Sequence, residues 1–196
     1  MRHRENNQHA HAERGNDLYE TPPEAVRALL EVEFIPETVW EPACGPGSIV
    51  RVLRESGHRV IATDLVDYGC EGQRAGVDFL KVQTAPAGAS IIVTNPPYMH
   101  ANAFVAHALH LCPRVLMLLR LGFIAGTKRT PILEGGMLAR MHVFRNRLPM
   151  MHRQGWSGPR ATSQTEFAWF SFDRAHYGPP LINRISWKSD NSENAA

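Results

Sequence analysis

The sequence predicts an α/β fold in which a mainly parallel sheet is covered by helices on both faces. Two observations lead to this prediction. Apolar runs of strand length alternate along the chain with segments whose apolar residues recur at helical spacing, as in sheets built from strand–helix repeats. Several of these runs, such as SIIV at 90–93, are apolar without alternation, which is expected for strands that are buried on both sides.

Length and composition are those of a single globular domain. A chain of 196 residues with a hydrophobic fraction of 43% can bury a core without disulfides, and its three cysteines include no close pair, so a reducing cytoplasm is expected. A net charge of +2 permits contact with nucleic acid through a local patch but does not require it. No apolar run is long enough to cross a membrane. We expect residues 1–16 to be a flexible polar arm, residues 17–186 to be one domain and residues 187–196 to be a flexible tail.

Helices and strands can be placed in order along the chain. Residues 21–32 predict a helix that Thr21 caps and that has prolines in its first turn. A glycine turn opens a second helix that Gly57 closes, a third helix is expected over 101–112, and a short fourth over 130–141. Strands are expected at 38–42, 58–65, 76–80, 90–95, 114–123, 142–148 and 165–173. The last two strands would form an antiparallel hairpin with a long loop.

Residues 94–98 read TNPPY and follow an apolar run directly. Neither Pro96 nor Pro97 has a backbone N–H, so the strand must stop there. Asn95 and Tyr98 are thereby left on a stiff loop at the carboxyl end of a strand. In open α/β sheets that is where ligands bind.

A second unusual stretch, EPACGPG, follows the first predicted strand. Gly45 and Gly47 would let the backbone approach a ligand closely, and the helix that begins there would favour a negative group. The third glycine of the dinucleotide fingerprint is absent, and no Gly-Lys-Ser/Thr of a Walker loop follows. A plain tight turn is the alternative interpretation.

Two aspartates follow the next predicted strands. Asp64 could accept hydrogen bonds from two ribose hydroxyls, or it could cap a helix. Asp78, next to Phe79, could accept from an adenine amino group, or it could be an ordinary surface aspartate. Neither residue decides between these alternatives when taken alone.

Taken in order, YETPPEAV, EPACGPG, TDL, VDFL and TNPPY resemble the class I S-adenosylmethionine-dependent methyltransferases, specifically those that methylate N6 of adenine in DNA. The resemblance covers roughly residues 17–175, and the motif order is similar to that of the gamma group. The stretches LLRLGFIAGTKR and SQTEFAWFSFDR resemble a family of compact methyltransferases that is found in phages and prophages. The family implies a Rossmann-like fold with a mainly parallel seven-stranded sheet whose last strand is antiparallel. It also implies that the protein works in the cytoplasm of a bacterial or phage-infected cell. The larger gamma enzymes carry a separate target-recognition domain, for which we expect no counterpart here.

The resemblance also implies a mechanism for the loop at 94–98. The Asn95 side-chain oxygen and the Pro96 carbonyl would accept both N–H bonds of the adenine amine, so that its lone pair points at the sulfonium methyl. Pro97 would stiffen the loop, and Tyr98 would stack on a flipped-out base. The methyl would pass in one in-line step without a metal or a covalent enzyme intermediate. S-adenosyl-L-methionine would be the cofactor and S-adenosyl-L-homocysteine the product.

The cofactor contacts follow from the same resemblance. Thr21 and Tyr19 would hold the carboxylate end of the methionine, Asp64 the ribose, and Asp78 with Phe79 the adenine. Leu65 would be an apolar wall for that ring. The full set implied for the cofactor is Tyr19, Thr21, Glu41, Ala43, Gly45, Gly47, Asp64, Leu65, Asp78, Phe79 and Asn95.

Contacts to the substrate are expected from a basic loop at 145–165, which could bind phosphates and offer a stacking side chain. An ordinary solvated hairpin loop is the alternative. Trp169 and Phe170 are expected in the core, and His107 and His110 on the surface or in the core rather than on a metal. The residues implied for the substrate are Tyr98, Lys128, Arg129, Arg145, Arg147, Arg153, Trp156 and Arg160.

DNA is the expected partner, with no membrane, and the tetrapeptide leaves other acceptors open. RNA adenines and the glutamine side chains of release factors pose the same electronic problem as a DNA adenine. A non-catalytic module that binds S-adenosylmethionine is a further alternative. Monomer and homodimer are both compatible with the sequence.

Overall fold

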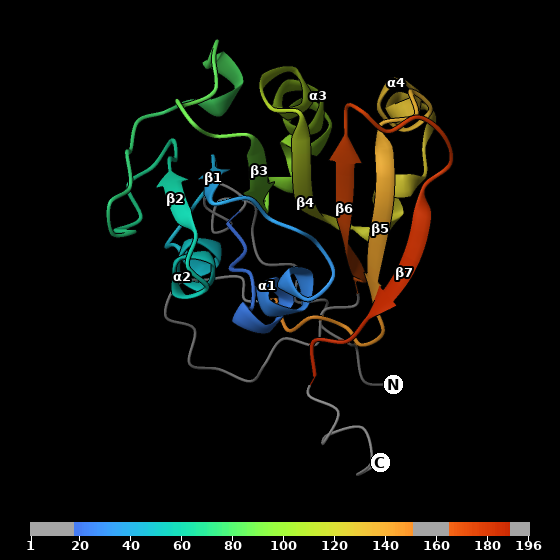
Figure 1. Cartoon of the computed structure of the whole chain (residues 1–196), viewed down its shortest axis with the longest axis horizontal. Helices are drawn as coiled ribbons and strands as arrows, with labels where there is room; N and C mark the ends of the chain where they lie inside the picture. Colours follow the sequence, from blue (N-terminus) through green and yellow to red (C-terminus); the bar gives the residue numbers. More distant parts are fainter. Residues whose placement is uncertain (1–17, 151–164, 189–196) are drawn as a thin grey trace, which may run out of the picture.

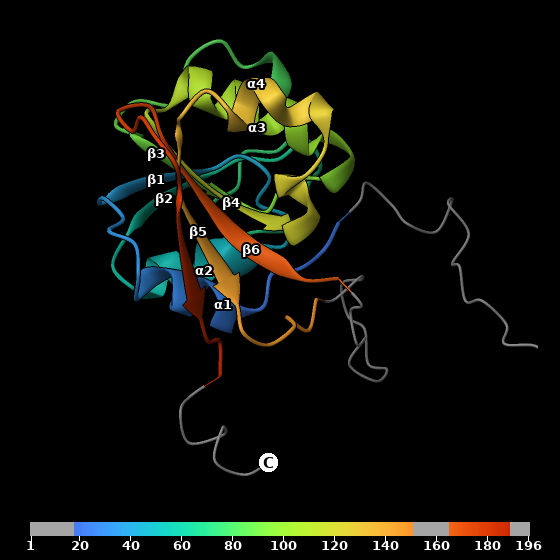
Figure 2. The ribbon, with the colours of Figure 1, turned by 90° about the vertical axis from the view of Figure 1, so that its right-hand side faces the viewer.

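The computed structural model of the chain describes residues 18–150 and 165–188. Seven strands form one sheet in the order β2-β1-β3-β4-β6-β5-β7, between two layers of helices (Figures 1 and 2). The sheet confirms the predicted fold class. The strands are β1 Thr38–Glu41, β2 Arg59–Ala62, β3 Ile91–Thr94, β4 Arg114–Arg120, β5 Leu138–Phe144, β6 Phe167–Asp173 and β7 Leu181–Ile185.

Most neighbouring strands are parallel. β1 pairs in parallel with β2 and β3, β3 with β4, and β5 with β7. β6, the last of the strands that the sequence predicted, is antiparallel to both β4 and β5, as expected. The carboxyl ends of β1 to β5 therefore all meet at one edge of the sheet.

One predicted strand is wrong and one strand was missed. Residues 76–80 form no strand; the chain makes an isolated bridge between Arg74 and Thr63, the residue after β2, and then enters the 3₁₀ helix η2 (Phe79–Lys81). Gly72 and Gly76, with φ of 68° and 74°, break the extended path on either side of that bridge. The seventh position is taken by β7 at the opposite edge, where four of the five residues are exposed, so that no core pattern marked it.

The helices cover the two faces in pairs. α1 (Pro23–Leu30) and α2 (Ser48–Glu55) lie on one face, and α3 (Ala101–Leu111) and α4 (Thr130–Leu133) lie on the other (Figure 2). Short 3₁₀ helices η3 (Tyr98–His100), η4 (Leu121–Ile124) and η5 (Thr127–Arg129) follow β3 and β4. No helix in the described ranges is long and apolar enough to span a membrane.

Two predicted helix boundaries are wrong. α1 is preceded by Pro22 rather than capped by Thr21, since the Ala25 N–H donates to the Pro22 carbonyl at 3.0 Å. The helix predicted over 130–141 ends at Leu133, because Gly136 takes a φ of 80°, and the chain then enters β5. β5 consequently starts four residues before the predicted strand.

The core consists of two apolar layers separated by the sheet. Along β4, Leu116 and Leu118 pack on the side of α1 and α2, whereas Val115, Met117 and Leu119 pack on the side of α3 and α4. This alternation follows from the two-residue period of a strand. Trp169 and Phe170 are buried, which confirms their predicted place in the core.

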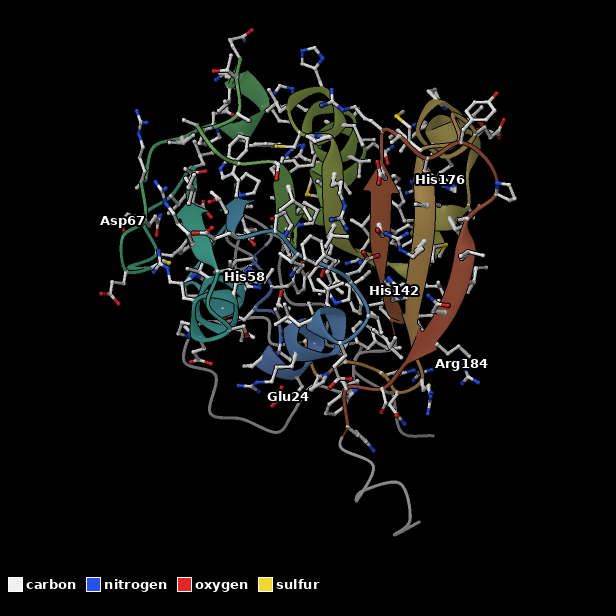
Figure 3. All side chains as sticks on the ribbon, in the orientation of Figure 1. Glu24, His58, Asp67, His142, His176 and Arg184 are labelled. Carbon is white, nitrogen blue, oxygen red and sulfur yellow. The ribbon has the colours of Figure 1, made fainter. Side chains whose placement is uncertain are left out.

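A buried ionic cluster lies between the end of α1 and the sheet. We define the Glu33 cluster as Glu33, Arg114, Arg140 and His142. Glu33 Oε1 accepts from Arg140 Nε at 2.7 Å and from His142 Nε2 at 2.9 Å, and Oε2 accepts from Arg114 at 3.1 Å. The Glu33 side chain is 2% exposed and His142 is fully buried, whereas Arg184 of β7 lies at the outer edge (Figure 3). Burial alone would raise the pKa of the Glu33 carboxyl, but hydrogen bonds from His142 and Arg140 outweigh it and lower the pKa to about 2.

Trp187 shows that the described structure continues past β7. Its Nε1–H donates to the Asn146 carbonyl at 3.0 Å, and its ring packs against the layer that contains α1 and α2. This residue begins the segment predicted as the C-terminal tail. The predicted arm at 1–16 and most of the tail lie outside the described residues.

Candidate functional site

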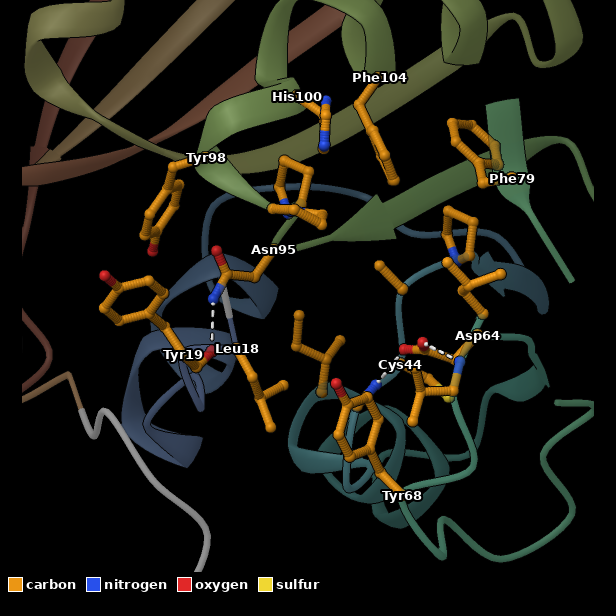
Figure 4. A pocket seen from close by; sticks show the side chains of 18 of the residues that line it. Leu18, Tyr19, Cys44, Asp64, Tyr68, Phe79, Asn95, Tyr98, His100 and Phe104 are labelled. Atoms are coloured by element: carbon orange, nitrogen blue, oxygen red, sulfur yellow. Dashed lines mark hydrogen bonds between the residues drawn. The ribbon is translucent and has the colours of Figure 1, made fainter. Parts of the chain in front are cut away.

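A cleft of about 1000 Å³ opens at the carboxyl edge of the sheet (Figure 4). The ends of β1, β2 and β3 form its floor, and residues 18–21, which precede α1, form one wall. Tyr19 and Tyr98 stand at one end of the cleft, Asp64 and Phe79 at the other, with Asn95 between them (Figure 4). The structure thus brings the following predicted residues together: Tyr19, Thr21, Ala43, Gly45, Asp64, Leu65, Asp78, Phe79, Asn95, Pro96, Pro97 and Tyr98.

The amide of Asn95 is held in one orientation. Its Nδ2 donates to the main-chain carbonyl of Tyr19 at 2.9 Å (Figure 4). Its Oδ1 is buried and accepts no hydrogen bond from any residue in the described parts of the chain. A buried acceptor without a donor costs free energy. The arrangement therefore presents an oxygen that is ready for a donor from a ligand.

Tyr98 lies within a cluster of rings and one guanidinium. Its ring centroid is 4.9 Å from that of Tyr19 and 5.7 Å from that of Phe167. The guanidinium carbon of Arg120 lies 4.7 Å from the same centroid. Tyr98 is therefore positioned at the cleft by its neighbours, and one of them is a cation that no sequence motif placed there.

Both the backbone angles and the close contacts of this turn require glycine at positions 45 and 47. Gly45 and Gly47 have φ of 50° and 87°. A Cβ on Gly45 would lie 2.9 Å from Leu18, and one on Gly47 would lie 2.6 Å from the Cys70 sulfur. The turn therefore packs against the wall residue Leu18 on one side and the loop after β2 on the other.

Asp64 joins the glycine turn to the end of β2. Its Oδ2 accepts from the Gly45 N–H at 2.8 Å and its Oδ1 from the Val66 N–H at 3.0 Å. Burial raises the pKa of the carboxyl, while these amide hydrogen bonds oppose the shift. No helix begins at this aspartate in the described structure, so the interpretation as a helix cap is not supported.

Asp78 and Phe79 form the far wall of the cleft. Asp78 pairs with Lys81 at 2.9 Å and accepts from the Leu80 N–H at 3.2 Å, which caps η2. The hydrogen bond from Lys81 lowers the pKa of Asp78. Phe79 is only 3% exposed and packs against Trp40 and Phe104, with ring centroids 5.3 and 4.8 Å away.

Glu41 lies beneath the cleft and does not line it. It is fully buried, and its Oε1 accepts from the Thr94 hydroxyl and, at 3.3 Å, from the Ala43 N–H. Burial raises its pKa well above the usual range. Because Thr94 immediately precedes Asn95, Glu41 couples the glycine turn to the TNPPY loop. Gly47 also lies outside the cleft lining.

Those predicted substrate cations that the structure describes do not line the cleft. Arg129 is bound to Asn102 at 3.1 Å and to two main-chain carbonyls, and Arg147 pairs with Glu166 at 3.0 Å. Lys128 is exposed on η5, and Arg145 follows β5; neither lines the cleft. Arg153, Trp156 and Arg160 lie outside the described residues.

Several cleft residues were not predicted. Arg120 is the one with the clearest chemical interest, and Leu18, Cys44, Tyr68, His100 and Phe104 also line the cleft. Arg120 ends an apolar strand at the same edge as Asn95, so its position in the sequence was a signal that could have been used. His107 binds the Val82 carbonyl at 3.0 Å, in agreement with a structural role.

Solved structures share this architecture at low sequence identity. No protein-family model and no curated protein sequence matches the chain. A protein assigned as the modification subunit of a type I restriction enzyme from Vibrio vulnificus is similar over 88% of this chain and 48% of its own, with a TM-score of 0.61 and 16% identity. The methyltransferase subunit of a type I restriction-modification system from Streptococcus thermophilus is similar over 84% of this chain and 44% of its own, with a TM-score of 0.54 and 13% identity.

A third solved structure carries the name of an enzyme class. It is assigned as a class I S-adenosylmethionine-dependent methyltransferase from Listeria monocytogenes and is similar over 89% of this chain and 68% of its own, with a TM-score of 0.58 and 11% identity. This chain spans about half the length of the two restriction-system subunits. The chain has the fold of the class I S-adenosylmethionine-dependent methyltransferases.

Proposed function

We propose that this protein transfers the methyl group of S-adenosyl-L-methionine to the exocyclic N6 amine of adenine in DNA. The observation that carries the proposal is the buried Oδ1 of Asn95. It accepts no hydrogen bond in the described structure, and the Tyr19 carbonyl holds the other atom of the amide. An acceptor fixed in this way suits a ligand that brings an N–H donor.

The Asp64 end of the cleft fits the cofactor that this fold implies. The cleft volume is of the size that small-molecule ligands need. Asp64 accepts the main-chain amides of Gly45 and Val66, and the Leu65 amide also acts on it. A carboxylate has about four acceptor sites, so Asp64 retains capacity for a ribose hydroxyl. Phe79 and Leu65 would flank the adenine, and Thr21 and Gly45 would lie along the methionine. When bound, the cofactor supplies an electrophilic methyl on a sulfonium sulfur.

The chain's own contribution to the reaction is to prepare the amine. The nitrogen lone pair of adenine is delocalised into the ring, so the amine is a poor nucleophile. Asn95 Oδ1 and the Pro96 carbonyl would accept its two N–H bonds, which favours a pyramidal nitrogen with its lone pair directed along the cleft. Because the prolines stiffen this loop, little reorganisation accompanies the transfer. The proton leaves afterwards to water.

DNA is the acceptor that the comparisons favour. Two proteins with this fold are named as modification or methyltransferase subunits of type I restriction systems. RNA adenine is the second candidate, because a 23S rRNA methyltransferase shares the fold and the Asn95 cradle would hold only the amine, which DNA and RNA adenines have in common. We further propose that the protein is of the compact phage type and has the motif order of the gamma group.

Methyl transfer from labelled S-adenosylmethionine tests the proposal directly. Unmethylated DNA, RNA and cell protein are offered separately, and digested DNA is analysed for N6-methyladenine. We expect label in that nucleoside from DNA. Label found in RNA adenine alone, or in protein glutamine, would show that the proposed acceptor is wrong. If no label is transferred to DNA, RNA or protein, the protein is better explained as a non-catalytic module that binds S-adenosylmethionine.

Replacing Asp64 by alanine tests the cofactor end separately. We expect the affinity for S-adenosylmethionine, measured by calorimetry, to fall at least about tenfold, because a hydrogen bond to a charged group is worth about 1.5–3 kcal/mol. Asp67→Ala is the matched control, since Asp67 is exposed, does not line the cleft and accepts from the Gly69 N–H. Equal affinities in the two variants would exclude Asp64 from the ribose site.

A further inference from the structure

Arg120 reaches over the Tyr98 end of the cleft from the last position of β4. β3 ends at Thr94, which pairs with Met117, whereas β4 continues to Arg120. The longer strand carries the guanidinium past the end of β3, beside the Asn95–Tyr98 loop. There it lines the cleft and lies over the Tyr98 ring at 4.7 Å.

No described residue neutralises the charge of Arg120. Within residues 18–150 and 165–188 its side chain makes no ion pair and no hydrogen bond; its contact is the aromatic ring. By contrast, Arg129, Arg140 and Arg147 each bind a side-chain oxygen. A cation–π contact uses none of the five N–H donors of a guanidinium, so all of them remain available to an acceptor.

Arg120 is also the most exposed of the described neighbours of Tyr98. Phe167 is 4% exposed within β6, and Tyr19 is partly buried. Arg120 is exposed and has a long side chain. A base that stacks on Tyr98 needs one face of the ring, and displacing Arg120 would vacate the face that its guanidinium covers.

We propose that Arg120 covers the Tyr98 ring in the free protein and moves to a phosphodiester flanking the target adenine when the base takes its place on the ring. The inference rests on the proposed function and sharpens it, because it makes a nucleic-acid strand the substrate. A protein glutamine has no phosphodiester. Guanidinium groups bind phosphate through paired N–H donors, which suits the unused donors of Arg120.

A binding cycle with an altered phosphate tests this contact. The probe is a short single-stranded oligodeoxynucleotide with one adenine among thymines, in the presence of S-adenosylhomocysteine. Its partner probe carries uncharged methylphosphonates at the two linkages that flank the adenine. We expect the wild type to bind the neutral probe about tenfold more weakly, and Arg120→Gln to bind the charged probe more weakly by about the same factor. The two changes together should cost no more than either alone, because they remove one interaction.

Arg59→Gln is the matched control. It removes one positive charge from an exposed position at the opposite edge of the sheet, where β2 begins. We expect this variant to discriminate between the two probes as the wild type does. Arg120→Gln should also flatten the salt dependence of binding by about 0.7 in slope, the value for one phosphate of a single strand, whereas Arg59→Gln should not.

Two results would overturn the inference. One is an Arg120→Gln variant that still discriminates between charged and neutral linkages as the wild type does. The other is a wild type that binds both probes equally. If such a wild type nevertheless methylates DNA adenine, only the role of Arg120 fails. If it transfers label to neither DNA nor RNA, the proposed function fails, and the role of Arg120 fails with it.

Discussion

Asn95→Ala is expected to lower the rate of methyl transfer by about 10²–10³-fold, the usual cost of removing one preorganised hydrogen-bonding group at a reacting centre. The loss follows from the Oδ1 that is held ready by the Tyr19 carbonyl. The affinity for S-adenosylmethionine should change little, because the interaction removed is made to the transferring amine. Single-turnover transfer to DNA gives the rate, and calorimetry gives the affinity.

Asn95→Asp is the informative companion variant. It keeps an oxygen where the amine would bind, but it replaces the Nδ2 donor by a second oxygen that faces the Tyr19 carbonyl. We therefore expect activity between those of the wild type and the alanine variant. An alanine variant that works within tenfold of the wild type would remove Asn95 from the chemistry and with it the main support for the proposed function.

Glu33→Ala is expected to lower the free energy of unfolding substantially. Removing one partner of a buried ionic cluster leaves the other charges uncompensated and costs about 3–5 kcal/mol. Arg114 and Arg140 retain some exposure and can take up water, so we expect a value near about 3 kcal/mol. Urea unfolding measures it, with Glu31→Ala as the control, since Glu31 is exposed at the end of the same helix.

The contribution of Glu33 depends on pH in a defined direction. Its folded-state pKa of about 2 lies below the ordinary value of 4.5, so the unfolded chain takes up the proton first as the pH falls. The stabilisation is complete above the ordinary value and is lost as the pH falls through about 2. The difference in unfolding free energy between the wild type and Glu33→Gln should therefore shrink over this window. A constant difference would contradict the lowered pKa.

The residues that can be located best from the sequence are those whose local chemistry ends a strand. Two prolines after an apolar run stop a strand in any fold, and this alone is enough to place Asn95 at the carboxyl edge of the sheet. The glycine turn is recognisable for a similar reason, since only glycine readily adopts the φ of Gly47. Local backbone constraints of this kind can be read from a few neighbouring residues.

Features that depend on distant pairing were missed. β7 is an exposed edge strand whose position comes from hydrogen bonds to β5, and its own residues show no buried face. Arg120 reaches the cleft only because β4 runs beyond β3. In the Glu33 cluster, Glu33 lies more than 80 positions from each of its partners, so no local sequence pattern could predict the cluster. All three features depend on which distant segments pair in the folded chain, and the residues around each feature are compatible with more than one pairing.

The hydrogen bond between Asn95 and residue 19 spans 76 positions of sequence and ends on a peptide carbonyl. No side-chain exchange at position 19 can delete that acceptor; only a change in the course of the chain ahead of α1 can displace it. Fusion tags, cleavage or binding events near that stretch are therefore expected to disturb the orientation of the Asn95 amide. Labels for solution experiments are accordingly best attached at the other terminus.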